Sequence, residues 1–449
     1  MARHQRQGQR DHGQRDHRQR AGRPDAQEAQ SQAPRRAALA LLSAVLGEGR
    51  LIAEVEERIL APLSPEDRAR AARLAGEVLR GLPRADRLLA PHMEKRPPMA
   101  VLNLLRLGTV ELASGGAAHG VVSDLVALAG AGKKTAGFKG MVNAVLRKLA
   151  EGAPEAWAAQ PVPRLPGWLR KPLVKRYGAA RVAAMEAAHE AGAPIDLTAK
   201  GDPAALAEAT GGVLLPTGSV RLAGPVQVSA LPGYEGGAFW VQDAAAALPA
   251  RLLAPAPGAK VLDLCAAPGG KTLQLAAMGA EVTALDISEA RAGRLRENLA
   301  RIGLAAEVVI ADALDWEGGP FEAILLDAPC SATGTIRRHP DLPHAKSAAS
   351  LAPLVALQEA LLDRALGMLA PGGRLLYCTC SLLPEEGEAQ VSAALRRHPG
   401  LRALPLEAPW IEPGWRSAEG GLRLAPDLWA AEGGMDGFYM ALLAPAAAD

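Results

Sequence analysis

Residues Asp263 to Thr272 read Asp-Leu-Cys-Ala-Ala-Pro-Gly-Gly-Lys-Thr, and this stretch decides the fold expected for the second half of the chain. The apolar run at 259–264 predicts a buried strand, and the residues after Gly270 predict a helix. A glycine-containing loop between a strand and a helix lets backbone N–H groups approach a ligand closely. The stretch therefore predicts a loop that binds a nucleotide-like cofactor.

Two other cofactor loops share parts of this pattern. Gly270-Lys271-Thr272 matches the end of the phosphate-binding signature G-x-x-x-x-G-K-[ST], but Cys265 occupies the position of its first glycine. The dinucleotide-binding signature G-x-G-x-x-G is absent. Both loops are therefore disfavoured, whereas S-adenosylmethionine, which also carries a ribose, stays a candidate.

Strands and helices alternate through the rest of the chain, the pattern of a doubly wound α/β sheet. The expected strands are Ala259 to Leu264, Glu281 to Asp286, Glu307 to Ile310, Phe321 to Leu326 and Arg374 to Tyr377.

Three aspartates, Asp286, Asp312 and Asp327, stand at or just after the ends of successive predicted strands. The ligand crevice of such a sheet lies at these carboxyl ends. Asp286 is expected to accept hydrogen bonds from ribose hydroxyls, and Asp312 to meet an adenine amino group. Each aspartate alone could be an ordinary turn or helix cap, but their joint placement favours a ligand site.

Two cysteines would face the same crevice: Cys330 in Asp-Ala-Pro-Cys-Ser and Cys380 in Tyr-Cys-Thr-Cys-Ser. Carbon 5 of a pyrimidine is a poor nucleophile, and a thiolate that adds to carbon 6 makes it reactive toward a methylsulfonium. Asp327 could then bond the ring nitrogen and amino group of a cytosine. A free thiol with a pKa near 8.5 is only a few per cent thiolate at neutral pH, so nearby donors or positive charge are required. A packing role is preferred for Cys265 and Cys378.

The chain is expected to contain a tail and three folded parts. Residues 1–34 are rich in Gln, Arg, His and Gly, so a disordered basic tail is predicted. Apolar residues at helical spacing predict an all-α domain over 35–153. Short apolar runs between Gly and Pro predict a small α+β module over 154–245, and 246–449 hold the α/β domain.

A basic segment between Glu155 and Glu186 contains no acidic residue and carries Trp168 and Tyr177 among its cations. A basic patch with aromatic rings suits RNA, and a solvated helix face with two buried rings explains it equally well.

Composition narrows the class of protein further. The net charge of +2 at pH 7 neither demands nor excludes a nucleic-acid partner. No apolar stretch reaches the roughly 18 residues of a membrane span, and no signal peptide is recognisable, so a cytoplasmic location is expected. The four cysteines have neither the spacing of a zinc site nor the density of a disulfide scaffold.

Read together, these motifs resemble the RNA cytosine-5 methyltransferase family, whose members join Asp-Ala-Pro-Cys-Ser to a later Thr-Cys-Ser in one Rossmann-like domain. The helical first domain, with Val142-Asn-Ala-Val-Leu-Arg147, is similar to the NusB-like domain of bacterial members that act on 16S ribosomal RNA. The resemblance implies an S-adenosylmethionine-dependent enzyme, expected here as a monomer, that methylates carbon 5 of a cytosine in 16S rRNA. Cys380 would be the nucleophile, and Cys330 would assist product release. The cofactor would be bound by Cys265, Ala266, Ala267, Pro268, Gly269, Gly270, Lys271, Asp286, Asp312 and Asp327.

Three alternatives stay open. DNA cytosine methyltransferases use the cysteine of their Pro-Cys motif as nucleophile, which makes Cys330 the competitor of Cys380. The chain could instead be an RNA-binding protein whose methyltransferase-like domain is inactive, or the same chemistry could act on another RNA.

Arg337 and Arg338, in the loop after the first cysteine, could contact RNA phosphates.

Overall fold

The predicted parallel strands form the centre of a mixed sheet in a computed structural model that describes residues 31–224 and 226–446. The strand order is β10-β12-β9-β8-β5-β6-β7, and β11 pairs with β12. The bounds are β5 (Lys260–Leu264), β6 (Glu281–Asp286), β7 (Glu307–Ile310), β8 (Phe321–Asp327), β9 (Leu369–Thr379), β10 (Leu401–Leu404), β11 (Leu422–Leu424) and β12 (Phe438–Pro445).

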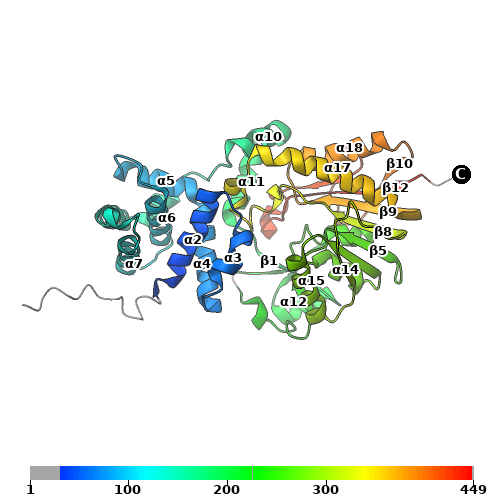
Figure 1. Cartoon of the computed structure of the whole chain (residues 1–449), viewed down its shortest axis with the longest axis horizontal. Coiled ribbons are helices and arrows are strands. Elements are labelled where there is room, and N and C mark those ends of the chain that lie inside the picture. The colour runs from blue at the N-terminus through cyan, green and yellow to red at the C-terminus, as the bar shows by residue number, and fades with distance from the viewer. Residues whose placement is uncertain (1–30, 225, 447–449) are drawn as a thin grey trace, which may run out of the picture. The chain divides into compact units, whose positions relative to one another are not determined.

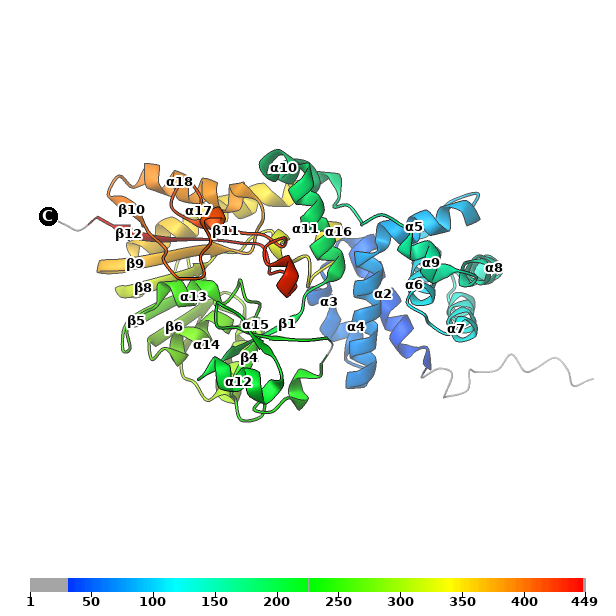
Figure 2. The same ribbon diagram turned by 180° about the vertical axis from the view of Figure 1, so that it is seen from behind.

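Helices cover both faces of this sheet (Figures 1 and 2). Leu262 and Leu264 of β5 pack with α17 and α18, whereas Val261 packs with α13 and α14 on the other face. This alternation is what the period-2 geometry of a strand requires. The helices are α13 (Leu248–Leu253), α14 (Gly270–Ala277), α15 (Glu289–Ile302), α16 (Leu342–Ala345), α17 (Leu351–Gly367) and α18 (Glu388–Arg397).

Three strands of the large sheet were not predicted. β10, β11 and β12 follow β9 in the sequence and pair antiparallel, with β12 inserted beside β9. β12 is buried along nearly its whole length, so its sequence is a continuous apolar run without alternation. Such a run does not distinguish a strand from a buried helix.

A small antiparallel sheet of order β2-β3-β1-β4 precedes the large one in the sequence and confirms the expected α+β character of the middle segment. Its strands are β1 (Ile195–Ala199), β2 (Val213–Leu214), β3 (Val220–Leu222) and β4 (Phe239–Val241). The helices of this segment are α9 (Ala153–Ala158), α10 (Gly167–Tyr177), α11 (Ala179–Ala191) and α12 (Pro203–Thr210). Leu197, Val220 and Phe239 form its core.

The N-terminal part is helical, as predicted, with α2 (Ala33–Glu48), α3 (Ile52–Leu60), α4 (Pro65–Arg80), α5 (Leu82–Leu89), α6 (Met99–Ala113), α7 (Ala118–Ala131) and α8 (Lys139–Ala150). α6 is buried over most of its length. A Cβ added at Gly108 of α6 would come within 2.6 Å of Leu146 and 2.8 Å of Leu125, so glycine allows the three helices to pack closely. Buried Arg35 joins α2 to α6 and α7 through Glu111 at 2.7 Å and Asp124 at 2.6 Å.

The chain divides into two units. One comprises Met1–Ser43, Ala53–Ala75 and Leu88–Trp157, and the other Ala44–Ile52, Gly76–Arg87 and Ala158–Asp449, which includes both sheets. The predicted tail, residues 1–34, lies outside the described residues except for 31–34. Ala33 and Pro34 belong to α2, so the prediction of disorder is wrong for these two residues. No helix in the described part of the chain is long and apolar enough to cross a membrane.

Candidate active site

The predicted cofactor loop lies between β5 and α14, at the carboxyl edge of the sheet. The neighbours of β5 are β6 on one side and β8 on the other, so the strand order reverses at this point, where open α/β sheets bind their ligands. Cys265 has a φ of 61° and Gly269 a φ of 103°, so the loop turns through left-handed backbone conformations. A Cβ at Gly269 would stand 2.1 Å from Leu295 Cδ1, so only glycine lets the loop lie this close to α15.

The three predicted acids follow the order of their strands along this edge. β7, β6, β5 and β8 are adjacent, so their carboxyl ends bring Asp312, Asp286, the loop and Asp327 into one row. Asp286 is buried, and its Oδ2 accepts the backbone N–H of Ala267 at 3.1 Å. Asp312 is exposed, and its Oδ1 accepts the backbone N–H of Leu314 at 2.9 Å. Asp286 Oδ1 also accepts the backbone N–H of Ser288 at 2.9 Å. Both acids therefore cap a local turn as well, the ordinary role that each of them alone could have.

Asp327 is held on two sides. Lys271 donates to Asp327 Oδ2 at 2.7 Å, and the Cys378 thiol donates to Oδ1 at 3.7 Å. Burial would lower the pKa of Lys271, but the Asp327 charge outweighs it and the pKa is raised, so Lys271 stays charged. Burial and the Asp327 charge raise the pKa of Cys378 well above its usual value, so this thiol stays protonated and can donate. Cys378 thus does more than pack, the role expected for it.

The two site cysteines lie side by side because their strands are parallel neighbours. Asp327 at the end of β8 pairs with Cys378 of β9, which brings the segments after both strands together. The Sγ atoms of Cys330 and Cys380 are 3.5 Å apart. The hydrogen bond to Cys380, burial, and the negative charges of Cys380 and Glu386 raise the pKa of Cys330 well above its usual value. The raised pKa means that Cys330 keeps its proton at neutral pH, which allows it to donate to the sulfur of Cys380.

A buried carboxylate, Glu386, fastens the two cysteine loops to each other. Its Oε2 accepts the hydroxyls of Ser331 and Ser381, each at 2.5 Å, and its Oε1 accepts the backbone N–H of Ser331 at 2.7 Å. Ser331 follows Cys330 and Ser381 follows Cys380. Hydrogen bonds to a charged acceptor are among the stronger ones in proteins, so this carboxylate fixes the position of both thiols.

The two arginines predicted to contact RNA phosphates have internal partners. Arg337 is fully buried and donates to the carbonyl oxygen of Gly433 at 2.6 Å, so the phosphate role predicted for it is wrong. Arg338 pairs with buried Asp436 through Nε at 2.8 Å and Nη2 at 2.5 Å. Burial would lower the pKa of Arg338, but the charges of Asp436, Asp243 and Cys380 raise it, which identifies Arg338 as a positive charge near the site.

The basic segment before Glu186 is partly structural. Trp168 Nε1 donates to the carbonyl oxygen of Pro343 at 3.2 Å, and the Tyr177 hydroxyl donates to that of Leu382 at 2.9 Å. Arg170 and Arg181 form ion pairs, the first with Glu186 at 2.8 Å and the second at 2.9 Å with another acid, Asp427. Two rings and two cations thus stabilise the fold, while Arg164, Lys171 and Lys175 are exposed.

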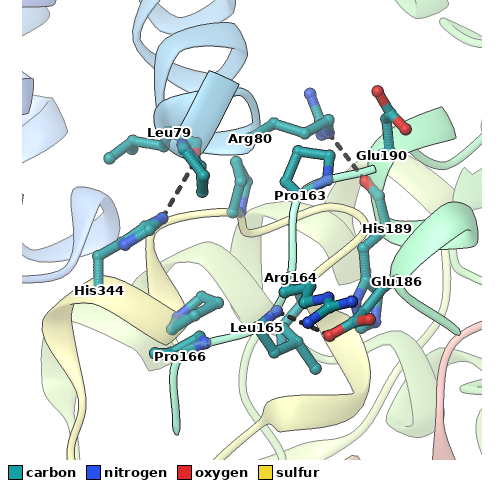
Figure 3. A pocket seen from close by; sticks show the side chains of 14 residues that line it. Leu79, Arg80, Pro163, Arg164, Leu165, Pro166, Glu186, His189, Glu190 and His344 are labelled. Atoms are coloured by element: carbon teal, nitrogen blue, oxygen red, sulfur yellow. Dashed lines mark hydrogen bonds between the residues drawn. The ribbon is translucent and has the colours of Figure 1, made fainter. Parts of the chain in front are cut away.

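A separate cavity of about 50 Å³ is lined in part by the segment that follows Cys330, including His344 (Figure 3). Leu79 and Arg80 line one side of it, and Arg80 donates to the carbonyl oxygens of His189 at 3.1 Å and of Arg337 at 2.8 Å. His189 is buried, and neither of its ring nitrogens has a partner in the described part of the chain. Burial and the charges of Arg337 and Arg80 lower the pKa of His189 to about 3. This histidine is therefore neutral at physiological pH.

The residues that sequence analysis missed are those that hold the thiols. Glu386 lies six residues after Cys380 and Lys346 sixteen residues after Cys330, whereas Asp436 is 56 residues beyond Cys380. Lys346 Nζ donates to the carbonyl oxygen of Ser331 at 2.9 Å. What distinguishes these three charged residues is their buried or half-buried environment. A single sequence does not reveal that environment.

Comparison with known proteins places the chain in a family. A family model described as 16S rRNA methyltransferase RsmB/F matches residues 250–444, and the NusB family model matches 32–151. The chain is 40% identical over 443 residues to ribosomal RNA small subunit methyltransferase B of Pseudomonas putida, which covers 92% of this chain and 99% of that protein. The enzyme of the same name from Sodalis glossinidius is 38% identical over 81% of this chain and 92% of its own.

The solved structure of PH0851 has the same fold, with a TM-score of 0.72 at 23% identity over 92% of this chain and 98% of that one. The sequence matches confirm the resemblance to RNA cytosine-5 methyltransferases and the NusB-like assignment of the helical domain. The chain belongs to the ribosomal RNA small subunit methyltransferase B family.

Proposed function

We propose that this protein transfers a methyl group from S-adenosylmethionine to carbon 5 of a cytosine in 16S rRNA, with Cys380 as the covalent nucleophile. The observation that carries the proposal is the pair of thiols 3.5 Å apart beside the Lys271–Asp327 ion pair. Both lie at the edge of the sheet where the cofactor loop lies. One thiol and one cofactor at the same edge are what methylation of a pyrimidine carbon requires.

The chain offers a suitable site for this cofactor. The loop Cys265 to Lys271 and the carboxylates of Asp286, Asp312 and Asp327 would hold it. Asp263, beneath the loop, accepts the Thr272 hydroxyl at 2.5 Å on Oδ2, while its buried Oδ1 has no partner among the described residues. An unpartnered buried carboxylate oxygen suits the hydrogen-bond donors of a polar ligand. The cofactor supplies an electrophilic methyl group on a sulfonium.

The charges around the thiols favour Cys380 over Cys330 as the nucleophile. Cys330 keeps its proton and can donate a hydrogen bond to Cys380 Sγ, where it would stabilise negative charge. Arg338 adds positive charge nearby. The Cys380 thiolate adds to carbon 6 of the cytosine, which places electron density on carbon 5. After methylation a base removes the proton from carbon 5, and the bond between Cys380 and carbon 6 breaks, a step that we assign to the assistance of Cys330.

Asp327 would orient the target base. Its carboxylate is fixed by Lys271 and Cys378, and it can accept a hydrogen bond from the amino group of the cytosine. A base that reacts at carbon 6 cannot remain stacked in a helix, so the cytosine is extruded or taken from unpaired RNA. We further propose that the protein acts as a monomer in the cytoplasm.

Substitution of the two cysteines tests the proposal. Incubated with 16S rRNA and S-adenosylmethionine, Cys330→Ala is expected to accumulate a covalent protein–RNA complex that survives denaturing electrophoresis. Cys380→Ala should form none and should transfer no labelled methyl group. The reverse pattern would exchange the two roles, and a wild-type protein that binds RNA but never transfers the methyl group would be an inactive relative.

A further inference from the structure

A cleft of about 240 Å³ lies between the small sheet and helices α13 and α14. All of its walls belong to the unit that contains both sheets. Its lining includes two cations, Arg251 and Lys200, and no acidic residue. One water needs only about 10–15 Å³ by the same measure, so the cleft has room for a larger polar group.

Arg251 of α13 is the unusual residue of this cleft. It makes no hydrogen bond or ion pair with any described residue, and its Nη1 is buried without a partner. Burial lowers the pKa of Arg251 to about 10, and no carboxylate counteracts this effect. Arg251 as a whole is half-buried, and a guanidinium partly removed from water without an anionic partner is unfavourable, so such residues are normally paired or bind a ligand.

The turn between β2 and β3 forms the wall opposite Arg251. Gly218 has a φ of 83°, and a Cβ added there would stand 3.3 Å from Arg251 Nη1, so the guanidinium lies against this glycine. The neighbouring Thr217 also lines the cleft, is only 4% exposed, and has a buried hydroxyl without a partner among the described residues. An arginine and a hydroxyl, both lacking acceptors, thus converge on one cleft.

Lys200 adds a second positive charge, and its position is fixed. Its Nζ donates to the carbonyl oxygen of Ile302 at 2.7 Å. Because a carbonyl does not neutralise the ammonium charge, Lys200 adds a second positive charge to a lining that contains no acidic residue.

We propose that this cleft binds a phosphate group of the RNA backbone, with Arg251 as the principal donor and Thr217 as a second one. A phosphate offers the acceptor oxygens that both side chains lack, and arginine binds it with two parallel hydrogen bonds. The inference deepens the proposed function and rests on it, because it names the surface over which the substrate RNA passes.

The position of the cleft suits an RNA strand that reaches the thiols. α14 carries Lys271 of the cofactor loop near its first residue and lines the cleft with Gln274 and Ala277. Lys271 and Ala277 are about 9 Å apart along the helix axis, at a rise of 1.5 Å per residue. A strand whose target base enters the site can therefore place a phosphate a few nucleotides away in the cleft.

The test uses the full-length protein with Arg251→Met and Thr217→Val, which keep the side-chain size but remove the donors. RNA affinity is measured as a function of salt without S-adenosylmethionine. Arg251→Met should weaken binding about tenfold and reduce the steepness of log K against log salt by about 0.7–0.9, the value for one lost phosphate contact. Thr217→Val should weaken binding severalfold and leave the salt slope unchanged.

Arg402→Met is the matched control. Arg402 is an exposed arginine of the edge strand β10 with the same charge, and its replacement should leave affinity and salt slope within about twofold of wild type. Melting temperatures of Arg251→Met without phosphate should equal or exceed those of wild type, because an unpaired buried charge has been removed. A lower melting temperature would make Arg251 a structural residue and overturn the inference.

A second arm separates RNA from a free phosphate ligand. Inorganic phosphate, compared with chloride at equal ionic strength, should raise the melting temperature of wild type and not of Arg251→Met. If phosphate protects only wild type but both proteins bind RNA equally, the cleft takes a free phosphate-bearing ligand and the RNA assignment is wrong. Methyl transfer is measured separately at saturating RNA, so a wild type that transfers no methyl group contradicts the proposed function and not this inference.

Discussion

At the scale of single residues, Glu386 shows how one buried carboxylate controls two thiols. It accepts hydrogen bonds from the residues that follow Cys330 and Cys380, and its charge is one of the causes that raise the pKa of Cys330. Glu386 forms no hydrogen bond with either of these two thiols, so it is a positioning residue. The same carboxylate thus sets both the place of the thiols and the protonation of one of them.

Glu386→Gln is predicted to lower turnover about tenfold, because roughly 1–2 kcal/mol of hydrogen bonding to a charged acceptor is lost. The loss of the charge should also lower the pKa of Cys330. In a Cys380→Ala background, the pH profile for alkylation of Cys330, followed by mass spectrometry, should move to lower pH.

The matched control is Glu385→Gln, which changes the exposed neighbouring residue. It should leave both turnover and the alkylation profile unchanged. The pH profile of Cys330 alkylation is compared in the Cys380→Ala background with and without Glu386→Gln. If the two profiles coincide, the charge of Glu386 does not affect Cys330, and this residue acts by packing alone.

At the scale of elements, the cofactor loop depends on how closely it can approach α15. Gly269 has a φ of 103°, and its Cα faces the fully buried Leu295. Any side chain at 269 therefore meets both an unfavourable backbone conformation and a filled core.

Gly269→Ala is predicted to weaken S-adenosylmethionine binding by at least about tenfold and to destabilise the protein by roughly 1–3 kcal/mol. Isothermal titration calorimetry and thermal unfolding measure the two effects. Gly293→Ala is the control, because a Cβ at this position of α15 meets no atom within 4 Å. Gly293→Ala should stabilise the protein slightly, because alanine favours a helix more than glycine does. Equal cofactor affinity of the Gly269→Ala and Gly293→Ala variants would refute the packing argument.

At the scale of the whole molecule, the buried His189 makes stability depend on pH. Its folded-state pKa is about 3, below the usual value of about 6.5 expected in the unfolded chain. As pH falls below about 6.5 the unfolded chain binds a proton that the folded protein does not, so this residue's contribution to stability is lost between pH 6.5 and pH 3. Asp263 and Asp436, whose pKa values burial raises to about 7, act in the opposite direction.

The comparison of wild type with His189→Leu isolates this contribution. Between pH 7 and pH 5 the free energy of unfolding of the wild type should fall by roughly 2 kcal/mol more than that of the variant. The reason is that pH 5 lies about 1.5 units below the pKa of an unfolded-state histidine, and only the wild type has this histidine. Calorimetry of the unfolding transition at both pH values gives the difference. His119→Leu, a change at an exposed histidine, should keep the pH dependence of wild type.

Sequence alone was sufficient to predict the helical N-terminal part, the central strands of the large sheet and the proximity of Cys330 and Cys380. Strand and helix periodicity located the five central strands within a few residues, because buried strands and the glycine loop have local signatures. The cysteine motifs and the acids after the strands were recognisable because parallel strands end at one edge. β12 was not predicted, because its pairing with β9 joins segments about 60 residues apart and its apolar sequence has no period.

Tertiary structure alone decided the properties that depend on contacts between distant segments. The thiol that keeps its proton is determined by a neighbour 50 residues away and by the buried Glu386. Arg337 is predicted from the sequence as a surface cation and is buried in the fold. Half-buried Arg251 has no anionic partner among the described residues. The physical reason is that residue type and spacing specify which groups are present, whereas pKa values and unpaired charges depend on burial and on distances that only the folded chain creates.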